Sequence, residues 1–515
     1  MSDTSKLSGA AAKTGANPVF IISLALVVIF VGVGILAPDQ LDAVTRSVHT
    51  AIIDNFGWGY LLGAFFFLLF ALYVAFSKYG RIRLGGDHEK PQYSYFGWFS
   101  MLFAAGMGIG LIFWGVAEPL SHYLNPPAYI AEGSGSAAAF AMRYSFFHWG
   151  FHPWAIYIVM SLSIAYFSFR RGMPPLISSC FYPLIGDRIF GWTGRAIDIL
   201  AVFATVFGIV TSLGLGALQI NEGLATVLPL PSGNSATLIL IVVVTVLYLI
   251  SSSTGLDKGI QLLSRANIMV ALALLAFLLV VGPTSYIFNI FTTTLGDLLS
   301  GLLTMSLSTN PFEGYEWTKS WTLFYWAWWI SWSPFVGLFV ASISRGRTIR
   351  EFILGALLVP ALLTFLWFSV FGGTAFHAEL VEGANIAERA VDNVSSALFL
   401  LFERLPFTPV LTILAIILLT VFFITSADSA TFVLAMMTSR GDLDPPLAKK
   451  IGWGVIQSTA AAVLLLTGGL EALQRMAIIA ALPFTFVMLF MMWSLYLGMR
   501  YEFKFELKER RRSER

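Results

Sequence analysis

The stretch Phe324-Tyr-Trp-Ala-Trp-Trp-Ile-Ser-Trp-Ser-Pro334 lies in the middle of an apolar segment that is long enough to cross a lipid bilayer. Tryptophans of membrane helices usually gather at the two helix ends, where the ring contacts headgroups. Here Trp326, Trp328, Trp329 and Trp332 lie near the centre, beside a proline that removes a backbone hydrogen bond. Electron-rich indole faces at this depth favour a site for a permanently charged alkylammonium group.

The composition of the whole chain places it among membrane proteins. Of its 515 residues, 57% are hydrophobic and 12% are charged, and the mean hydropathy is +0.78. Apolar segments of about 20 residues recur from end to end, which predicts an all-α polytopic membrane protein in contact with the lipid bilayer. The net charge of +2 gives no indication of nucleic acid, and we expect none as a partner. The one cysteine, Cys180, excludes an intramolecular disulfide.

The apolar segments predict twelve membrane spans. Residues 18–37 resemble a signal peptide, but the apolar core is too long and no A-x-A-like site follows it, so we expect a retained first span. The predicted spans lie near residues 18–37, 57–77, 95–123, 137–168, 191–220, 235–254, 264–283, 321–344, 350–375, 407–437, 452–468 and 473–499.

Basic residues predict the orientation of the spans. Six of the 31 lysines and arginines fall in one set of loops, and the other 25 lie in the termini and the opposite loops. Because cytoplasmic loops are enriched in basic residues, both termini are predicted to be cytoplasmic. The six in the predicted outer loops are Arg46, Arg143, Lys319, Arg389, Arg404 and Arg475.

One connection between spans has helical spacing of its own. In residues 291–306, apolar residues recur at helical intervals among threonines and serines. The segment fits an amphipathic helix along the outer interface and fits a packed loop helix equally well.

Helix breakers interrupt two spans at matching depth. The third span contains glycines at every second position, Gly106, Gly108 and Gly110, which favours local unwinding. The eighth is predicted to break at Ser331-Trp-Ser-Pro334. The two breaks are five spans apart along the chain, the offset expected of two five-helix repeats, and paired broken helices indicate a binding site at mid-membrane. Close helix packing is the alternative explanation for the glycines.

This interpretation divides the chain into one membrane domain with short ends. The predicted parts are a cytoplasmic segment (1–17), two peripheral helices (18–94), a first repeat (95–283), an outer connection (284–320), a second repeat (321–499) and a short cytoplasmic tail (500–515).

A second aromatic group lies in the fourth predicted span. At about 100° per residue, Trp149, Trp154 and Tyr157 line one side of a helix if Pro153 leaves it intact. Together with Trp329 they predict a four-ring enclosure, because several cation–π contacts of about 0.5–2 kcal/mol each hold a trimethylammonium group. The alternative is that these rings are ordinary core packing.

The polar residues of the spans indicate no enzyme. His148 and His152 have i, i+4 spacing but lack the surrounding residues of a zinc motif, and we found neither a phosphate loop nor convergent acid, base or nucleophilic groups. Glu118 and Asp428 are carboxylates in or near the membrane, where a functional role is the default. We expect them instead to satisfy backbone groups at broken helices.

The motifs, taken in order, resemble those of the betaine/carnitine/choline transporters over roughly residues 15–500. The segments that carry the resemblance are Gly106-Met-Gly-Ile-Gly110, Trp149-Gly-Phe-His-Pro-Trp154, Trp328-Trp-Ile-Ser-Trp-Ser-Pro-Phe-Val-Gly337 with the following Arg345-Gly-Arg347, and Thr425-Ser-Ala-Asp428. The resemblance implies a twelve-span LeuT-like fold with inverted repeats, alternating access, a homotrimer and a location in the bacterial cytoplasmic membrane.

The family's site residues carry over onto matching positions of this chain. Its central aromatic box corresponds to Trp149, Trp154, Tyr157 and Trp329, and its substrate path to Trp328 and Trp332. The unwound third span, from Gly106 through Met107 and Gly108 to Gly110, would contact the substrate's carboxylate, with Phe113 one turn further. One coupling sodium ion would lie among Ala104, Met107, Phe422, Thr425 and Ser426.

Three departures from the family pattern bear on function. A second sodium position retains Thr205 and Phe335, but Ile209 replaces an oxygen-bearing residue. Either this second ion is bound more weakly, or the hydroxyl of Thr211 or Ser212 compensates. Choline-transporting members tend to have an aspartate where this chain has Gly110, which favours a zwitterion. The tail, residues 500–515, is short and mixed in charge, which makes osmotic activation doubtful.

The sequence therefore predicts a sodium-coupled symporter of glycine betaine or a similar compatible solute, with no cofactor other than the coupling ion. The alternatives are a choline importer and a sodium-independent carnitine or betaine exchanger. A channel is disfavoured because the tryptophans at mid-span leave no continuous polar pore lining.

Overall fold

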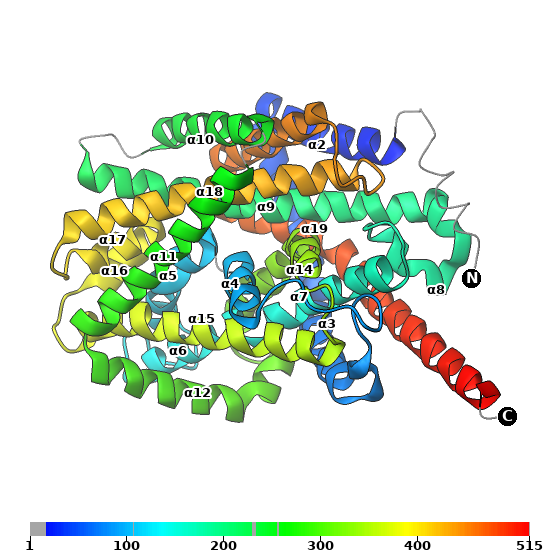
Figure 1. The fold of residues 1–515 in the computed structure, drawn as a ribbon. Helices are drawn as coiled ribbons and strands as arrows, with labels where there is room; N and C mark the ends of the chain where they lie inside the picture. The colour runs from blue at the N-terminus through cyan, green and yellow to red at the C-terminus, as the bar shows by residue number, and fades with distance from the viewer. Residues whose placement is uncertain (1–16, 107, 229–232, 255–256, 514–515) are drawn as a thin grey trace.

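A computed structural model describes residues 17–106, 108–228, 233–254 and 257–513, and every regular element in these ranges is helical (Figure 1). The long helices are α2 (Pro18–Leu36), α3 (Pro38–Phe76), α4 (Tyr95–Gly106), α5 (Ile109–Leu124), α6 (Gly135–Trp149), α7 (Phe151–Ala165), α9 (Trp192–Val227), α10 (Asn234–Thr254), α11 (Asp257–Val281), α12 (Thr284–Leu307), α14 (Phe324–Ser342), α15 (Ile349–Leu380), α18 (Thr408–Met437) and α19 (Leu447–Ser513). The short ones are η1 (Lys78–Arg81), η2 (Tyr166–Arg170), η3 (Ser178–Phe181), α8 (Tyr182–Ile185), η4 (Gly186–Phe190), α13 (Tyr315–Thr318), η5 (Lys319–Leu323), α16 (Ile386–Asp392), η6 (Val394–Ser396) and α17 (Ala397–Phe402).

Eleven helical segments of the described chain are long and apolar enough to cross a membrane, which confirms an all-α polytopic membrane protein. The eleven do not map one to one onto the twelve predicted spans. The third predicted span is absent from them because it is divided between α4 and α5, and the last two are merged in α19, where Gly468 and Gly469 have non-helical angles. The α12 helix is included by length and hydropathy, although the sequence placed it outside the spans.

The burial of the helices follows their composition. Helices α2, α10 and α11 bury only a minority of their apolar residues, as expected for helices with a broad face toward lipid. The α6–α7 segment and α14 are almost completely buried. The α14 helix packs against α7, α9 and α19, so the tryptophan stretch lies at the centre of the molecule (Figure 1).

The break in the third predicted span is confirmed. Helix α4 ends at Gly106 and α5 begins at Ile109, and Gly108 between them has φ −118° and ψ −145°. The fourth predicted span is broken as well, at Gly150 between α6 and α7 (φ −96°, ψ −122°), rather than at Pro153. Pro153 lies in the first turn of α7, where its missing N–H costs no helical hydrogen bond.

The predicted break in the eighth span is wrong. Helix α14 continues through Pro334 to Ser342. Proline leaves the carbonyl of Ile330 without its usual donor, and the hydroxyl of Ser333 donates to that carbonyl at 2.7 Å. A serine hydroxyl thus replaces the lost backbone donor, which is how membrane helices tolerate proline.

Helix α12 (Thr284–Leu307) is longer than residues 291–306, the part for which the sequence showed helical spacing. Helix α12 spans 24 residues and packs against α6 and α15. Its buried residues include Ile287, Thr294 and Leu298, whereas Phe288 and Leu299 are exposed, so the helix is apolar on both its packed and its open faces.

Four of the described ion pairs lie on the side of the protein predicted to be cytoplasmic. Arg170 donates to Glu502 of α19 and to Asp87, whose pKa this contact with the guanidinium lowers. Glu502 is therefore paired and buried rather than solvated, while the end of α19 projects from the body (Figure 1).

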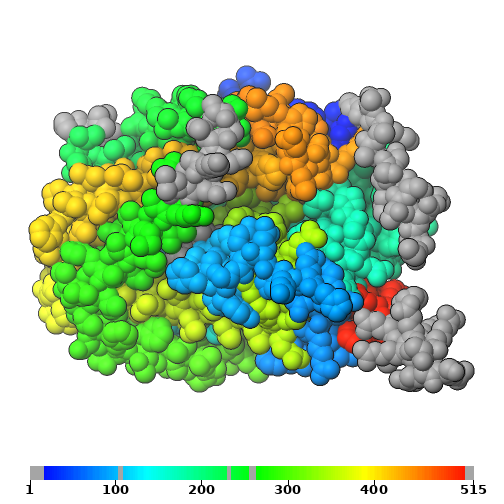
Figure 2. All heavy atoms as spheres, viewed as in Figure 1, coloured from blue at the N-terminus to red at the C-terminus, as the bar shows by residue number. Residues whose placement is uncertain are grey.

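Helix α4 and the preceding loop lie at the surface (Figure 2). Tyr95 and Phe96 at the start of α4 are exposed.

Candidate functional site

The two halves of one broken span, α6 and α7, and the central helix α14 bring the predicted aromatic residues together. Trp149 is the last residue of α6, Trp154 and Tyr157 lie on α7, and Trp329 lies on α14. Each of the four side chains is at most 3% exposed. They therefore face the interior of the bundle and not the surrounding lipid. We call these four residues the aromatic box.

The rings of the aromatic box stand nearly at right angles to one another. The ring centroids of Trp149 and Trp329 are 4.8 Å apart with planes at 74°, and those of Tyr157 and Trp329 are 6.2 Å apart at 79°. Trp154 meets Tyr157 at 5.7 Å and 86°. Rings at right angles to one another can direct their faces toward a common central point. The rings are also in mutual contact, so a ligand between them requires that they move apart.

The two neighbouring tryptophans extend the box along α14. Trp328 stacks on Trp329 at 4.6 Å and 16°, and Trp332 lies 6.3 Å from Tyr157. Phe335 continues the stack, 6.0 Å from Trp332. The sequence placed Trp328 and Trp332 on a substrate path, and the structure places them in contact with the box.

Hydrogen bonds from the indole nitrogens fix the orientation of three of these rings. Trp329 donates to the backbone carbonyl of His148 at 3.0 Å, and Trp328 donates to the carbonyl of Gly208 at 3.3 Å. Trp149 donates to Oε2 of Glu118 at 2.7 Å. In contrast, the hydroxyl of Tyr157 is buried and has no hydrogen-bond partner in the described part of the chain.

The broken span adjoins the box through Gly110. A Cβ atom at this position would lie 2.7 Å from Cη2 of Trp328 and 2.9 Å from Cη2 of Trp149, so the two rings close over the glycine. Gly108 and Phe113 are buried on the same segment. Gly106 ends α4, and its surroundings, like those of Ala104, are not described. Met107 lies outside the described residues.

The role expected of Glu118 is wrong, because its carboxylate binds side chains rather than backbone groups. Oε1 accepts from Nε2 of His122 at 3.2 Å and from Nδ1 of His148 at 2.8 Å. Oε2 accepts from Trp149 and from the hydroxyl of Tyr325. All of these side chains are buried, and Glu118 is completely so. A carboxylate of α5 thus holds a wall of the aromatic box.

The two histidines of the rejected zinc motif have different partners. His148 bonds to Glu118 and, through Nε2, to the hydroxyl of Thr322 at 2.9 Å, whereas His152 bonds to Ser306 of α12. The ligand atoms of Glu118, His122 and His148 lie within 4.8 Å of one another, close enough to hold a metal ion. The same atoms are already hydrogen-bonded to one another, and we interpret the group as a hydrogen-bond network.

The sequence did not identify this network, although it contained a signal. Glu118 and His122 are one helical turn apart on α5, and an acid and an imidazole within one membrane span are costly unless they are paired. Nothing in the sequence indicated that His148, Thr322 and Tyr325 from other elements would complete the pairing.

The residues predicted to bind the first sodium ion lie in part on α18. Thr425 and Ser426 are half-buried, and the Thr425 hydroxyl donates to the carbonyl of Val421 at 2.9 Å. The start of α5 is close, because Ile109 and Phe423 both lie against Gly216 of α9. Phe422 is buried beside them.

The predicted second sodium position lies where α9 and α14 approach closely. The position of a Cβ on Gly208 would be 2.7 Å from the backbone nitrogen of Trp332, and Thr205 is one turn away from Gly208 on α9. The Thr205 hydroxyl donates to the carbonyl of Ala201 at 2.6 Å.

The two hydroxyls suggested as replacements also donate to backbone carbonyls. Thr211 donates to the carbonyls of Phe207 and Leu473, the latter on α19. Ser212 lies 3.4 Å from the carbonyl of Gly208.

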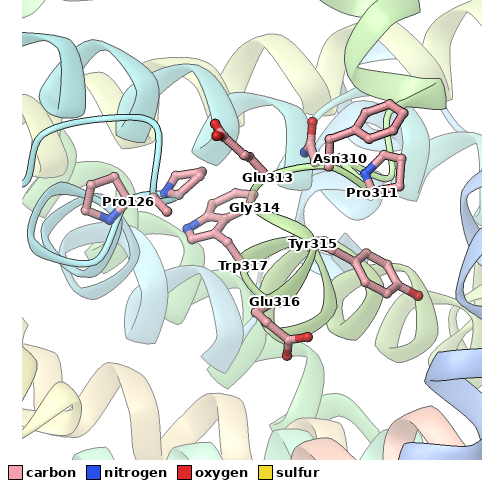
Figure 3. A pocket seen from close by; sticks show the side chains of 11 residues that line it. Pro126, Asn310, Pro311, Glu313, Gly314, Tyr315, Glu316 and Trp317 are labelled. Atoms are coloured by element: carbon pink, nitrogen blue, oxygen red, sulfur yellow. The ribbon is translucent and has the colours of Figure 1, made fainter.

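A separate pocket of about 400 Å³ lies on the side predicted to be outside, lined by Pro126, Pro127, Ala128 and residues 310–317 (Figure 3). The side chains of Tyr315 and Glu316 point away from the Pro126 side, whereas the Trp317 indole points toward it (Figure 3). The ring of Trp317 is 4.9 Å from that of His122. The pocket therefore adjoins the Glu118 network rather than the aromatic box.

Comparison with known proteins places this arrangement among transporters. Residues 18–504 match the family described as BCCT, betaine/carnitine/choline family transporter. The glycine betaine transporter OpuD of Bacillus subtilis (strain 168) is 52% identical over 483 residues, which cover 93% of this chain and 94% of that protein.

Two further relatives are similar over nearly the whole chain. The ectoine/hydroxyectoine transporter of Virgibacillus pantothenticus is 46% identical, covering 93% of this chain and 95% of that protein. The glycine betaine transporter of Acinetobacter baylyi (strain ATCC 33305 / BD413 / ADP1) is 42% identical, covering 96% of this chain and 75% of that protein.

Proposed function

The chain belongs to the betaine/carnitine/choline transporter family, and we propose that it is a sodium-coupled symporter that imports glycine betaine or a similar zwitterionic compatible solute by alternating access. It is a membrane transporter and not an enzyme. We place it in the bacterial cytoplasmic membrane as a homotrimer with both termini cytoplasmic, and with sodium as the only cofactor.

The observation that carries the proposal is the aromatic box. Its rings are buried at nearly perpendicular angles, and a quaternary ammonium group offers no N–H to a hydrogen-bond acceptor. Aromatic faces attract such a cation electrostatically, more strongly as water is excluded. Indole hydrogen bonds to Glu118 and to the His148 carbonyl orient two of the walls before a ligand arrives.

The break between α4 and α5 supplies the complementary group for a zwitterion. Backbone N–H groups at the start of α5 have no intrahelical partner, and a helix N-terminus favours negative charge. A carboxylate bound there would lie next to Gly110, which contacts two rings at the box. Sodium would be held by the oxygens of Thr425 and Ser426 with carbonyls of the same break.

The direct test is uptake by the purified protein in proteoliposomes. Labelled glycine betaine should accumulate when sodium is high outside, and choline, carnitine, ectoine and proline serve as competitors. Uptake that is unchanged when potassium replaces sodium would exclude symport and favour the exchanger. Preferential uptake of choline would favour the other alternative.

A further inference from the structure

The Glu118 network is joined to the aromatic box by the hydrogen bond from Trp149 to Glu118. It contains two imidazoles, those of His122 and His148, that have no role in the proposed transport function. We propose that Glu118, His122 and His148 form a proton-binding site whose charge sets how strongly the box attracts a cation. This inference rests on the proposed function, because it concerns the affinity of the same box.

The hydrogen bonds of Glu118 fit an ionised carboxylate. Its two oxygens accept from four donors, which are His122, His148, Trp149 and Tyr325. An ionised carboxylate offers about four acceptor sites, whereas a protonated one must donate through one oxygen. No lysine or arginine of the described residues forms an ion pair with Glu118, so the negative charge is held by hydrogen bonds and histidine alone.

His148 is suited to hold an added proton. Its Nδ1–H donates to Glu118, and its Nε2 lies 2.9 Å from the hydroxyl of Thr322. A hydroxyl is both donor and acceptor, so Thr322 donates to the neutral ring and accepts from the charged ring. Both states of His148 are therefore fully paired.

His122 differs from His148 in this respect. Its Nε2–H donates to Glu118, but its Nδ1 is buried without a partner in the described part of the chain. Protonation would add a buried, unpaired N–H, which is costly. We therefore assign the added proton to His148 and treat His122 as a fixed donor.

The surroundings of the network are aromatic. The titratable neighbours of His148 are Tyr144 of α6 and Tyr325 of α14, at ring distances of 5.7 and 4.7 Å, and the buried His152 of α7. Trp317 and Trp321 pack on His122 from the segment that precedes α14.

Two charged groups lie further out. Arg143 of α6 stands over the Phe140 ring, which contacts His122. Glu379 of α15 is bonded to the backbone nitrogens of Ile386 and Ala387. Neither group contacts the network, so neither contributes to its charge. With Glu118 ionised and His122 neutral, the net charge of the network is −1 when His148 is neutral and zero when His148 is protonated.

This charge acts on the box through Trp149, whose indole N–H donates to Glu118. An ammonium group in the box would be separated from the carboxylate only by that ring, in an interior from which water is excluded. Neutralising the network is therefore expected to weaken binding of a cation by about tenfold. Affinity should therefore be lower when the network has taken up a proton.

The test is the Kd of glycine betaine for the purified protein, measured by tryptophan fluorescence at about pH 5 and about pH 8. The wild-type Kd should be about tenfold higher at the lower pH. In His148→Gln the amide still donates to Glu118 but takes up no proton, so the Kd should be nearly independent of pH. Thr322→Val, which removes the acceptor for the added proton, should weaken the pH dependence.

The matched control is His377→Gln, at a partly exposed histidine paired with Glu382, which should keep the wild-type pH dependence. A wild-type Kd that does not change with pH would overturn the inference, as would a full pH effect that persists in both His148→Gln and Thr322→Val. A wild-type protein that binds no betaine at either pH would instead refute the proposed function.

Discussion

Nε1 of Trp149 lies 2.7 Å from Oε2 of Glu118, so that a ring of the aromatic box on α6 is fixed by a carboxylate on α5. The same carboxylate accepts from Tyr325 of α14, which carries Trp329 one turn further on. Helices α6 and α14, which carry Trp149 and Trp329 of the box, therefore meet α5 at one buried anion. If α5 shifts relative to α14, these hydrogen bonds must either break or move the bonded rings along with α5. The position of α5 is therefore linked to the geometry of the box.

The hydroxyl of Tyr157 provides a test of whether its ring face or its polar group matters. The hydroxyl is buried without a partner in the described residues, so Tyr157→Phe should leave the free energy of unfolding unchanged or raise it by about 1 kcal/mol. Because the ring face remains, betaine uptake should stay within roughly twofold of wild type. Tyr157→Leu, which removes the face, should lose uptake. Equal uptake by the two variants would refute a cation–π role for this ring.

The continuity of α14 through Pro334 depends on Ser333. Ser333→Ala removes the donor to the Ile330 carbonyl inside the protein, and the loss should lower the free energy of unfolding by about 1–3 kcal/mol. Ser342→Ala is the matched control, because that exposed hydroxyl makes the same type of bond to Phe339. The melting temperature of Ser333→Ala should be clearly lower. Identical melting temperatures would show that the carbonyl needs no such donor.

Selectivity should depend on Gly110. Gly110→Asp adds a carboxylate beside the box and should raise the ratio of choline to betaine uptake. Because any Cβ there meets the rings of Trp328 and Trp149, the maximal rate should fall as well. Gly110→Ala reports the steric part alone and should lower the rate without changing the ratio. An unchanged ratio in Gly110→Asp would contradict our interpretation of this position.

Sodium dependence should reside on one face of α18. Thr425→Val removes a predicted ion ligand, and we expect the sodium concentration for half-maximal uptake to rise about tenfold or more. Thr420→Val is the control, since Thr420 makes the same type of backbone bond on the same helix. A sodium dependence equal to wild type in both variants would remove Thr425 from the ion site.

Much of the fold could be predicted because the membrane constrains it strongly. Apolar length identified an all-α polytopic membrane protein, and the glycines at 106, 108 and 110 identified the break before α5. The break at Pro334 was mispredicted, since the compensating hydroxyl of Ser333 is a side-chain bond that helix propensity does not include. The break at Gly150 was missed because one glycine in an apolar run is a weak signal.

The clustering of the aromatic rings in the interior could be predicted, because tryptophans at mid-span are unusual in membrane helices. The polar pairs around Glu118 could not. The partners of Glu118 come from α6, η5 and α14, and their convergence depends on tertiary packing that the chain order does not reveal.

The measurement that tests the central claim most directly is glycine betaine binding and uptake by Trp329→Leu, compared with Trp326→Leu. Both residues are buried tryptophans of α14, but Trp326 stacks on His152 outside the box. We predict that Trp329→Leu folds, as judged by a monodisperse gel-filtration profile, and neither binds nor transports betaine, while Trp326→Leu retains binding. Near-normal binding by Trp329→Leu would contradict a quaternary ammonium site formed by these rings.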